Sequence, residues 1–127
     1  MKYSVFYMRP EWFSDGSLGG MVYNDPDHER FAKYLPHPAR LRKTHAFLTS
    51  LEAETGIAGL EQIFHDMQGH IWSPNGEARE LIEARGLSHT SMSTGDVVVD
   101  EDGRAFMVAF FGFAAWNSDT ARWEDMP

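Results

Sequence analysis

The chain has 127 residues, no cysteine and a formal net charge of −8 at pH 7. This length predicts a single domain, residues 1–127, whose core needs no disulfide or metal to hold it together. An apolar share of 43% excludes a disordered chain, and the missing cysteines exclude thiolate metal sites. No apolar run approaches the length of a membrane span or a signal-peptide core, so we expect a cytoplasmic protein without a membrane partner.

The negative charge is unevenly distributed along the chain. Residues 1–43 contain seven basic and five acidic residues, whereas residues 44–127 contain four basic and fourteen acidic ones. The only cluster of cations consists of Arg40, Arg42 and Lys43, and the affinity of a protein for nucleic acid depends on many phosphate contacts. Direct nucleic-acid binding is therefore disfavoured, and an acidic surface of this kind attracts a basic partner or keeps the protein in solution.

The N-terminal third predicts one strand and one short helix. Residues 3–8 (YSVFYM) are β-branched and aromatic, which favours a strand that Pro10 ends. Residues 11–24 contain two glycine turns and predict a loop or a loose hairpin. Asp25 and Pro26 are typical of a helix start, and Pro36 would end that short helix.

Three helices are predicted in the middle of the chain. The first covers residues 41–54, because four side chains recur there at helical spacing: Leu41, Thr44, Leu48 and Leu51. The second contains the apolar stripe of residues 60–67 and ends at Gly69. The third runs from residue 74 or 76 to residue 85, and Gly86 would end it in a Schellman motif with Leu87 packed on Ile82.

The C-terminal part changes to a strand pattern. Residues 97–99 and 104–111 predict a β-hairpin with its turn at Asp102 and Gly103. The return strand is apolar on both faces, so either it is central in a sheet or a second copy closes one face and forms a homo-oligomer. Residues 114–127 predict a docked tail. The expected fold is α+β: a small, mainly antiparallel sheet of the first strand and the hairpin, with three to four helices packed on one face.

The hydroxyl-rich segment at residues 89–96 (HTSMSTGD) is the strongest candidate for a site. It has no lysine and one glycine, unlike a phosphate-binding loop, and Ser91 and Ser93 lack the glycine elbow of a serine nucleophile. We interpret the segment as a turn in which the hydroxyls satisfy backbone amides, Gly95 supplies conformational freedom and Asp96 accepts hydrogen bonds at the start of a strand.

The rest of the sequence gives little indication of a metal site or a catalytic site. No two of the six histidines have the spacing of a helical zinc site, so we expect no metal and no cofactor. His45 is interpreted as a residue at the boundary between the core and the surface. The carboxylate pairs at residues 77 and 80 and at residues 100 and 102 are interpreted as solvated. Aromatic residues in loops are typical anchors of protein interfaces, and they make Trp12, Phe13 and Trp72 candidate binding residues.

Two motifs carry a resemblance to a known family. Residues 67–79 (MQGHIWSPNGEAR) and residues 89–97 (HTSMSTGDV) resemble a family of small uncharacterised proteins carried on bacterial plasmids and integrative elements, and the second motif is more distantly similar to YodL-like domains. The resemblance implies a mobile genetic element, a bacterial cytoplasm and an accessory role, and it implies no activity. The matched positions are Trp72, Ser73, Asn75, Glu77, Ser91, Ser93 and Asp96.

The preferred functional interpretation is a non-catalytic accessory protein that binds another protein. Within that class we expect an inhibitor of a host defence nuclease or surveillance complex, of the anti-restriction or anti-CRISPR type, whose acidic half imitates DNA. One alternative is a small enzyme with a pocket near Trp72, His89 and Asp96. The other is a nucleic-acid-binding module that uses Arg40, Arg42 and Lys43.

Overall fold

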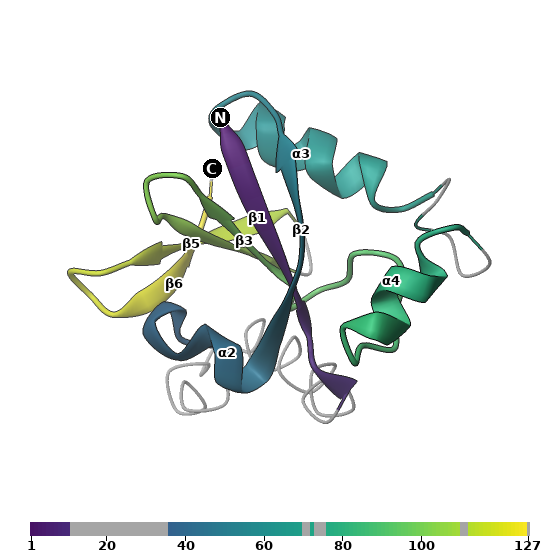
Figure 1. Cartoon of the computed structure of the whole chain (residues 1–127). Coiled ribbons are helices and arrows are strands. Elements are labelled where there is room, and N and C mark those ends of the chain that lie inside the picture. The colour runs from purple at the N-terminus through teal and green to yellow at the C-terminus, as the bar shows by residue number, and fades with distance from the viewer. Residues whose placement is uncertain (11–35, 70–71, 73–75, 110–111, 127) are drawn as a thin grey trace.

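A six-stranded antiparallel sheet dominates the fold (Figure 1). The structure is a computed structural model that describes residues 1–10, 36–69, 72, 76–109 and 112–126. The strands pair in the order β2-β1-β3-β4-β5-β6. Their bounds are β1 (Lys2–Met8), β2 (His45–Glu52), β3 (Val97–Asp100), β4 (Ala105–Val108), β5 (Phe113–Asn117) and β6 (Arg122–Asp125).

The described helices are short. A 3-10 turn, η2 (Pro38–Arg40), continues into α2 (Leu41–Thr44), and the other two helices are α3 (Ile57–Asp66) and α4 (Arg79–Ala84). In the part of the chain that the structure describes, none of these helices is long and apolar enough to cross a membrane.

The predicted α+β fold with three to four helices on a small sheet is wrong. The largest error is the helix predicted over residues 41–54, of which only residues 41–44 are helical. The chain turns extended at His45 and then pairs with β1 from Met8 opposite His45 to Lys2 opposite Glu52. An isolated surface helix of this length is marginal in water, so pairing with an apolar strand determines the structure here.

The prediction for the C-terminal tail is also wrong. Residues predicted to dock as an irregular tail form β5 and β6, whose pairing places Trp116 opposite Trp123 with ring centroids 5.3 Å apart. The indole nitrogen of Trp123 donates a hydrogen bond to the carbonyl of Pro36 at 2.8 Å. This bond ties β6 to the segment that leads into η2 and α2.

Local predictions in the C-terminal half are confirmed. The strand β4 lies between β3 and β5, as expected of a strand that is apolar on both faces, and β1 pairs with β3. Gly86, at φ 71°, ends α4 in a Schellman motif: its N–H donates to Glu83 and that of Leu87 donates to Ile82, both at 3.0 Å. This helix begins at Arg79, later than predicted.

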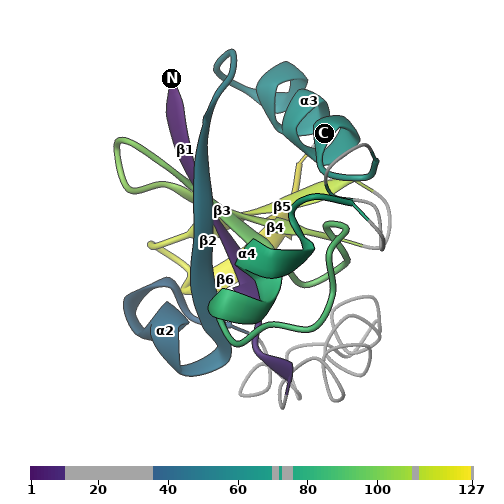
Figure 2. The same ribbon diagram turned by 45° about the vertical axis from the view of Figure 1, so that its right-hand side comes forward.

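Side chains alternate across β1 and separate two hydrophobic clusters. Tyr3, Val5 and Tyr7 point into the larger cluster, which α3 and α4 cover. Phe6 faces the smaller cluster on the other side of the sheet, which contains Leu41 of α2. Figures 1 and 2 show α2 on one side of β2 and the helices α3 and α4 on the other.

Gly59, in the first turns of α3, is expected to tolerate no side chain. A Cβ atom there would collide with the carbonyl oxygen of Glu54, which also accepts a hydrogen bond from the Tyr3 hydroxyl at 2.8 Å. Alanine normally stabilises a helix by about 1 kcal/mol relative to glycine. Because the collision outweighs this gain, we expect Gly59→Ala to lower the free energy of unfolding by about 1–3 kcal/mol in urea denaturation.

A neighbouring residue supplies the control for this prediction. Ala58 is exposed on the same helix, so Ala58→Gly should cost about 1 kcal/mol from helix propensity alone. A Gly59→Ala variant as stable as the wild type would contradict the close approach of the Glu54 carbonyl.

Candidate functional site

The hydroxyl-rich segment forms a tight turn around the side chain of Asp96. The N–H of Asp96 donates to the carbonyl of Ser93 at 3.0 Å, and Gly95 supplies the positive φ of 99° that this turn requires. Asp96 Oδ2 accepts the N–H of Ser93 at 2.8 Å, and Oδ1 accepts the N–H of Met8 at 2.9 Å. The carboxylate is fully buried and joins the end of β1 to the start of β3.

His89 also forms a hydrogen bond with this carboxylate. Its Nε2 lies 2.9 Å from Oδ2 and 3.1 Å from Oδ1 of Asp96, so this nitrogen carries the hydrogen. The imidazole stacks on the ring of Tyr7, with centroids 4.5 Å apart and planes 12° apart. Burial, and secondarily the charge of Asp96, raise the pKa of the Tyr7 phenol, whose hydroxyl donates to the carbonyl of Thr90 at 2.9 Å.

A second histidine is buried beside the same turn. His45 Nε2 lies 2.7 Å from the carbonyl oxygen of Gly95, and Nδ1 lies 2.7 Å from the hydroxyl oxygen of Thr44. Its side chain is fully buried, so the interpretation of His45 as a boundary residue is wrong. Burial lowers the pKa of His45, against the opposing effects of the Gly95 carbonyl and of Asp96.

The serine hydroxyls of this segment serve the backbone. Ser91 donates to the carbonyl of Trp72 at 3.0 Å, and Ser93 donates to the carbonyl of Ser91 at 3.1 Å. Their partners are therefore carbonyls and not the amides that the sequence suggested. The amide of Ser93 is satisfied by Asp96 instead.

The pair of His89 and Asp96 has the composition of a general base with its orienting acid. A base must reach a reacting group, but the His89 side chain is only 10% exposed and its other ring nitrogen, Nδ1, is buried. A nucleophilic serine would donate its hydrogen to that base, whereas Ser91 and Ser93 donate theirs to the backbone. In this arrangement the cluster shapes and stabilises the chain.

The remaining candidate residues are dispersed. Trp72 is buried in the larger hydrophobic cluster, whereas Glu77 is exposed before α4. The other four candidates lie outside the described residues: Trp12, Phe13, Ser73 and Asn75. Asp100, interpreted as solvated, is buried and accepts a hydrogen bond from Arg104 Nε at 2.7 Å. Across the described ranges, no three histidine or acidic side chains gather where they could hold a metal ion.

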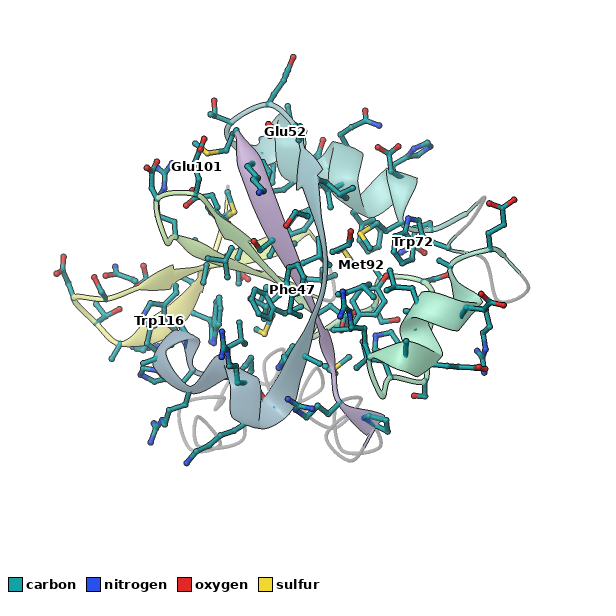
Figure 3. The ribbon with its side chains drawn as sticks, in the orientation of Figure 1. Phe47, Glu52, Trp72, Met92, Glu101 and Trp116 are labelled. Atoms are coloured by element: carbon teal, nitrogen blue, oxygen red, sulfur yellow. The ribbon has the colours of Figure 1, made fainter. Side chains whose placement is uncertain are left out.

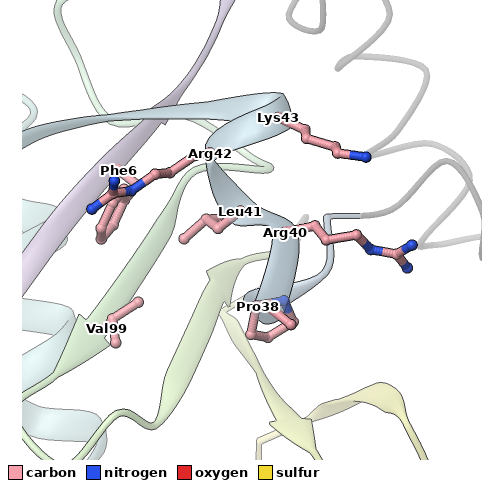
Figure 4. A pocket seen from close by; sticks show the side chains of 8 residues that line it. Phe6, Pro38, Arg40, Leu41, Arg42, Lys43 and Val99 are labelled. Carbon is pink, nitrogen blue, oxygen red and sulfur yellow. The ribbon is translucent and has the colours of Figure 1, made fainter.

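A pocket of about 410 Å³ lies on the other side of the sheet (Figure 4). Its walls come from β1, β3 and the η2–α2 segment. The lining residues are Phe6, Pro38, Ala39, Arg40, Leu41, Arg42, Lys43 and Val99. The sequence identified the three cations but not the pocket, because Phe6 and Val99 reach it only through the pairing of the sheet.

Most of the described carboxylates lie on the surface. Twelve of the fourteen described carboxylates are exposed, the two buried ones being Asp96 and Asp100. Glu52 and Glu101 lie at the end of the sheet near the N-terminus, opposite α2 (Figure 3). The cations of α2 mark the other end.

Comparison of the chain with protein-family models, curated proteins and solved structures found no match.

Proposed function

We propose that this chain is a non-catalytic accessory protein that acts by binding another protein. The observation that carries the proposal is the buried state of the Asp96 cluster, because the polar groups best suited to chemistry are used to hold β1, β2 and the turn before β3 together. The charged groups lie instead on the surface, where they can recognise a partner.

The proposed partner is a DNA-binding component of a bacterial defence system, either a nuclease or a surveillance complex. DNA carries one negative charge for each 1.7 Å or so of its axis, and proteins that bind it present a dense basic channel. The carboxylates at the end of the sheet near the N-terminus offer a complementary surface, among them Glu52, Glu54, Glu101 and Asp102. The motif resemblance to proteins of bacterial plasmids and integrative elements supports the same setting.

The test is a DNA-cleavage assay with a purified restriction nuclease and a purified CRISPR surveillance complex. We expect the wild-type protein to inhibit at least one of them, and to inhibit less as the salt concentration rises. The double variant Glu52→Lys/Glu101→Lys should inhibit at least tenfold less, because like charges across an interface cost several kcal/mol. The matched control, Glu61→Lys/Glu80→Lys, changes the same charge on α3 and α4 and should inhibit normally.

Absence of inhibition at low salt in every assay would contradict the defence-inhibitor role. Equal loss in both double variants would show that only the total charge matters and would contradict a specific surface at this end of the sheet.

A small enzyme remains the second candidate, and one observation favours it. His89 and Asp96 are in direct contact, as a catalytic pair would be. We place it second because the carboxylate is fully buried and already accepts hydrogen bonds from Met8 and Ser93.

A further inference from the structure

The pocket beside α2 combines an apolar floor with cationic walls. The side chains of Phe6, Leu41 and Val99 surround the space beneath α2, and Arg42 also lines it (Figure 4). Arg40 and Lys43 extend from the other side of the helix. A volume of about 410 Å³ falls within the range of pockets that enclose small ligands or single anchoring side chains.

The backbone of α2 is held by the end of β1. The carbonyl of Arg42 accepts a hydrogen bond from Arg9 Nε at 3.0 Å, and the carbonyl of Thr44 accepts one from the N–H of Arg9 at 2.8 Å. These bonds fix the backbone of α2 against the sheet. The position of the pocket wall is therefore set before any ligand binds, which lowers the entropic cost of binding.

Some arginines elsewhere on the described surface are paired with carboxylates. Arg79 pairs with Glu83 at 3.1 Å, and Arg104 pairs with Asp100 at 2.7 Å. Among the described residues, Arg40, Arg42 and Lys43 form no ion pair. Their charges are therefore not neutralised by any carboxylate of the described residues.

We propose that this pocket binds an acidic peptide segment of a partner protein, with one apolar side chain of that segment seated on the floor of Phe6, Leu41 and Val99. The carboxylates of the segment pair with Arg42, Arg40 and Lys43. The apolar side chain packs on the apolar floor, which removes it from water. A nucleic acid would match the cations and could stack a base on Phe6, but the floor has no hydrogen-bonding group for the edges of the bases.

This binding surface is separate from the one in the proposed function. It lies at the α2 end of the sheet, whereas the carboxylates proposed to contact a defence protein lie at the opposite end. Either proposal can therefore fail while the other holds, and the charge variants of the two surfaces distinguish them.

The probe is a fluorescein-labelled nine-residue peptide with a central leucine flanked by four glutamates on each side. We expect fluorescence anisotropy to show saturable binding at low salt. Arg42→Glu should weaken binding about fivefold to tenfold, since an exposed ion pair contributes up to about 1 kcal/mol and the reversal adds repulsion. Lys2→Glu, which makes the same charge change at the far end of β1, should bind the peptide like the wild type.

A second set of measurements tests the floor and the class of ligand. Replacing the leucine of the peptide with serine should weaken binding to the wild type, and Val99→Ser should remove most of that difference. Thermal unfolding of each variant confirms that it is folded. The proposal is overturned if the peptide does not bind, if Arg42→Glu binds it as well as Lys2→Glu does, or if a single-stranded oligonucleotide of equal charge binds more tightly.

Discussion

Replacing Asp96 with asparagine is expected to lower the free energy of unfolding by about 1–3 kcal/mol, the cost of leaving a buried hydrogen-bond donor without an acceptor. The carboxylate accepts hydrogen bonds from the N–H groups of Met8 and Ser93 on different oxygens, and from His89. An asparagine retains one oxygen, so its NH₂ group must face one of these donors. A buried donor on Met8, Ser93 or His89 is then left without an acceptor.

Urea denaturation followed by circular dichroism measures this change. Asp102→Asn is the matched control, because Asp102 lies in the exposed β3–β4 turn and its carboxylate makes only a long contact of 3.5 Å with Arg104. That variant should stay within about 0.5 kcal/mol of the wild type, as surface substitutions generally do. If Asp96→Asn were equally mild, the carboxylate would not be the structural centre described above.

His45 is expected to make the protein less stable as the pH falls below about 6.5, the ordinary pKa of histidine. Burial lowers the pKa of His45 in the folded state, so between the two pKa values the unfolded chain binds more protons than the folded one. The free energy of unfolding therefore falls with falling pH in this window, by at most about 1.4 kcal/mol for each pH unit. Below the folded-state pKa this contribution becomes constant.

The groups around the imidazole determine the size of this effect. Asp96 favours the protonated ring, whereas His89 and Arg9 oppose it, and burial exceeds them all. The hydroxyl of Thr44 can donate to the neutral ring at Nδ1 or, once the ring is protonated, to the carbonyl of Leu41 at 3.3 Å. The protonated ring keeps hydrogen-bond partners, so the penalty comes from desolvation of its charge.

Urea denaturation at a series of pH values between 7.5 and 4.5 tests the prediction. His45→Gln should have a flatter dependence of stability on pH than the wild type, because glutamine can donate to the Gly95 carbonyl without titrating. His65→Gln, whose ring is 85% exposed, should keep the wild-type dependence. Identical slopes in all three proteins would contradict a buried, neutral His45.

The elements that the sequence predicted correctly depend on short-range signals. The turn at Asp102 and Gly103 determines the β3–β4 hairpin, and Gly86 ends α4 because glycine readily adopts the positive φ found there. The acceptor role of Asp96 is equally local, since Ser93 lies three residues before it.

The residues that complete the candidate site could not be predicted in the same way. Tyr7 reaches the carbonyl of Thr90 across 83 positions of the chain, and His45 reaches that of Gly95 across 50. Neither residue has a neighbour in the sequence that indicates its partner. The pocket beside α2 has the same origin, because Phe6 and Val99 meet there only through the sheet.

The amino-acid sequence by itself determined the hairpin, the helices α3 and α4, the turn before β3 and the uneven charge, because each depends on residues a few positions apart. Tertiary structure alone decided that residues 45–52 form β2, although their leucines also fit a helix. The open edge of β1 offered seven residues of backbone pairing and buried Leu48 in the core, which a short helix on the surface could not match. The same pairing buried His45 beside Asp96 and placed the cations of α2 above an apolar floor.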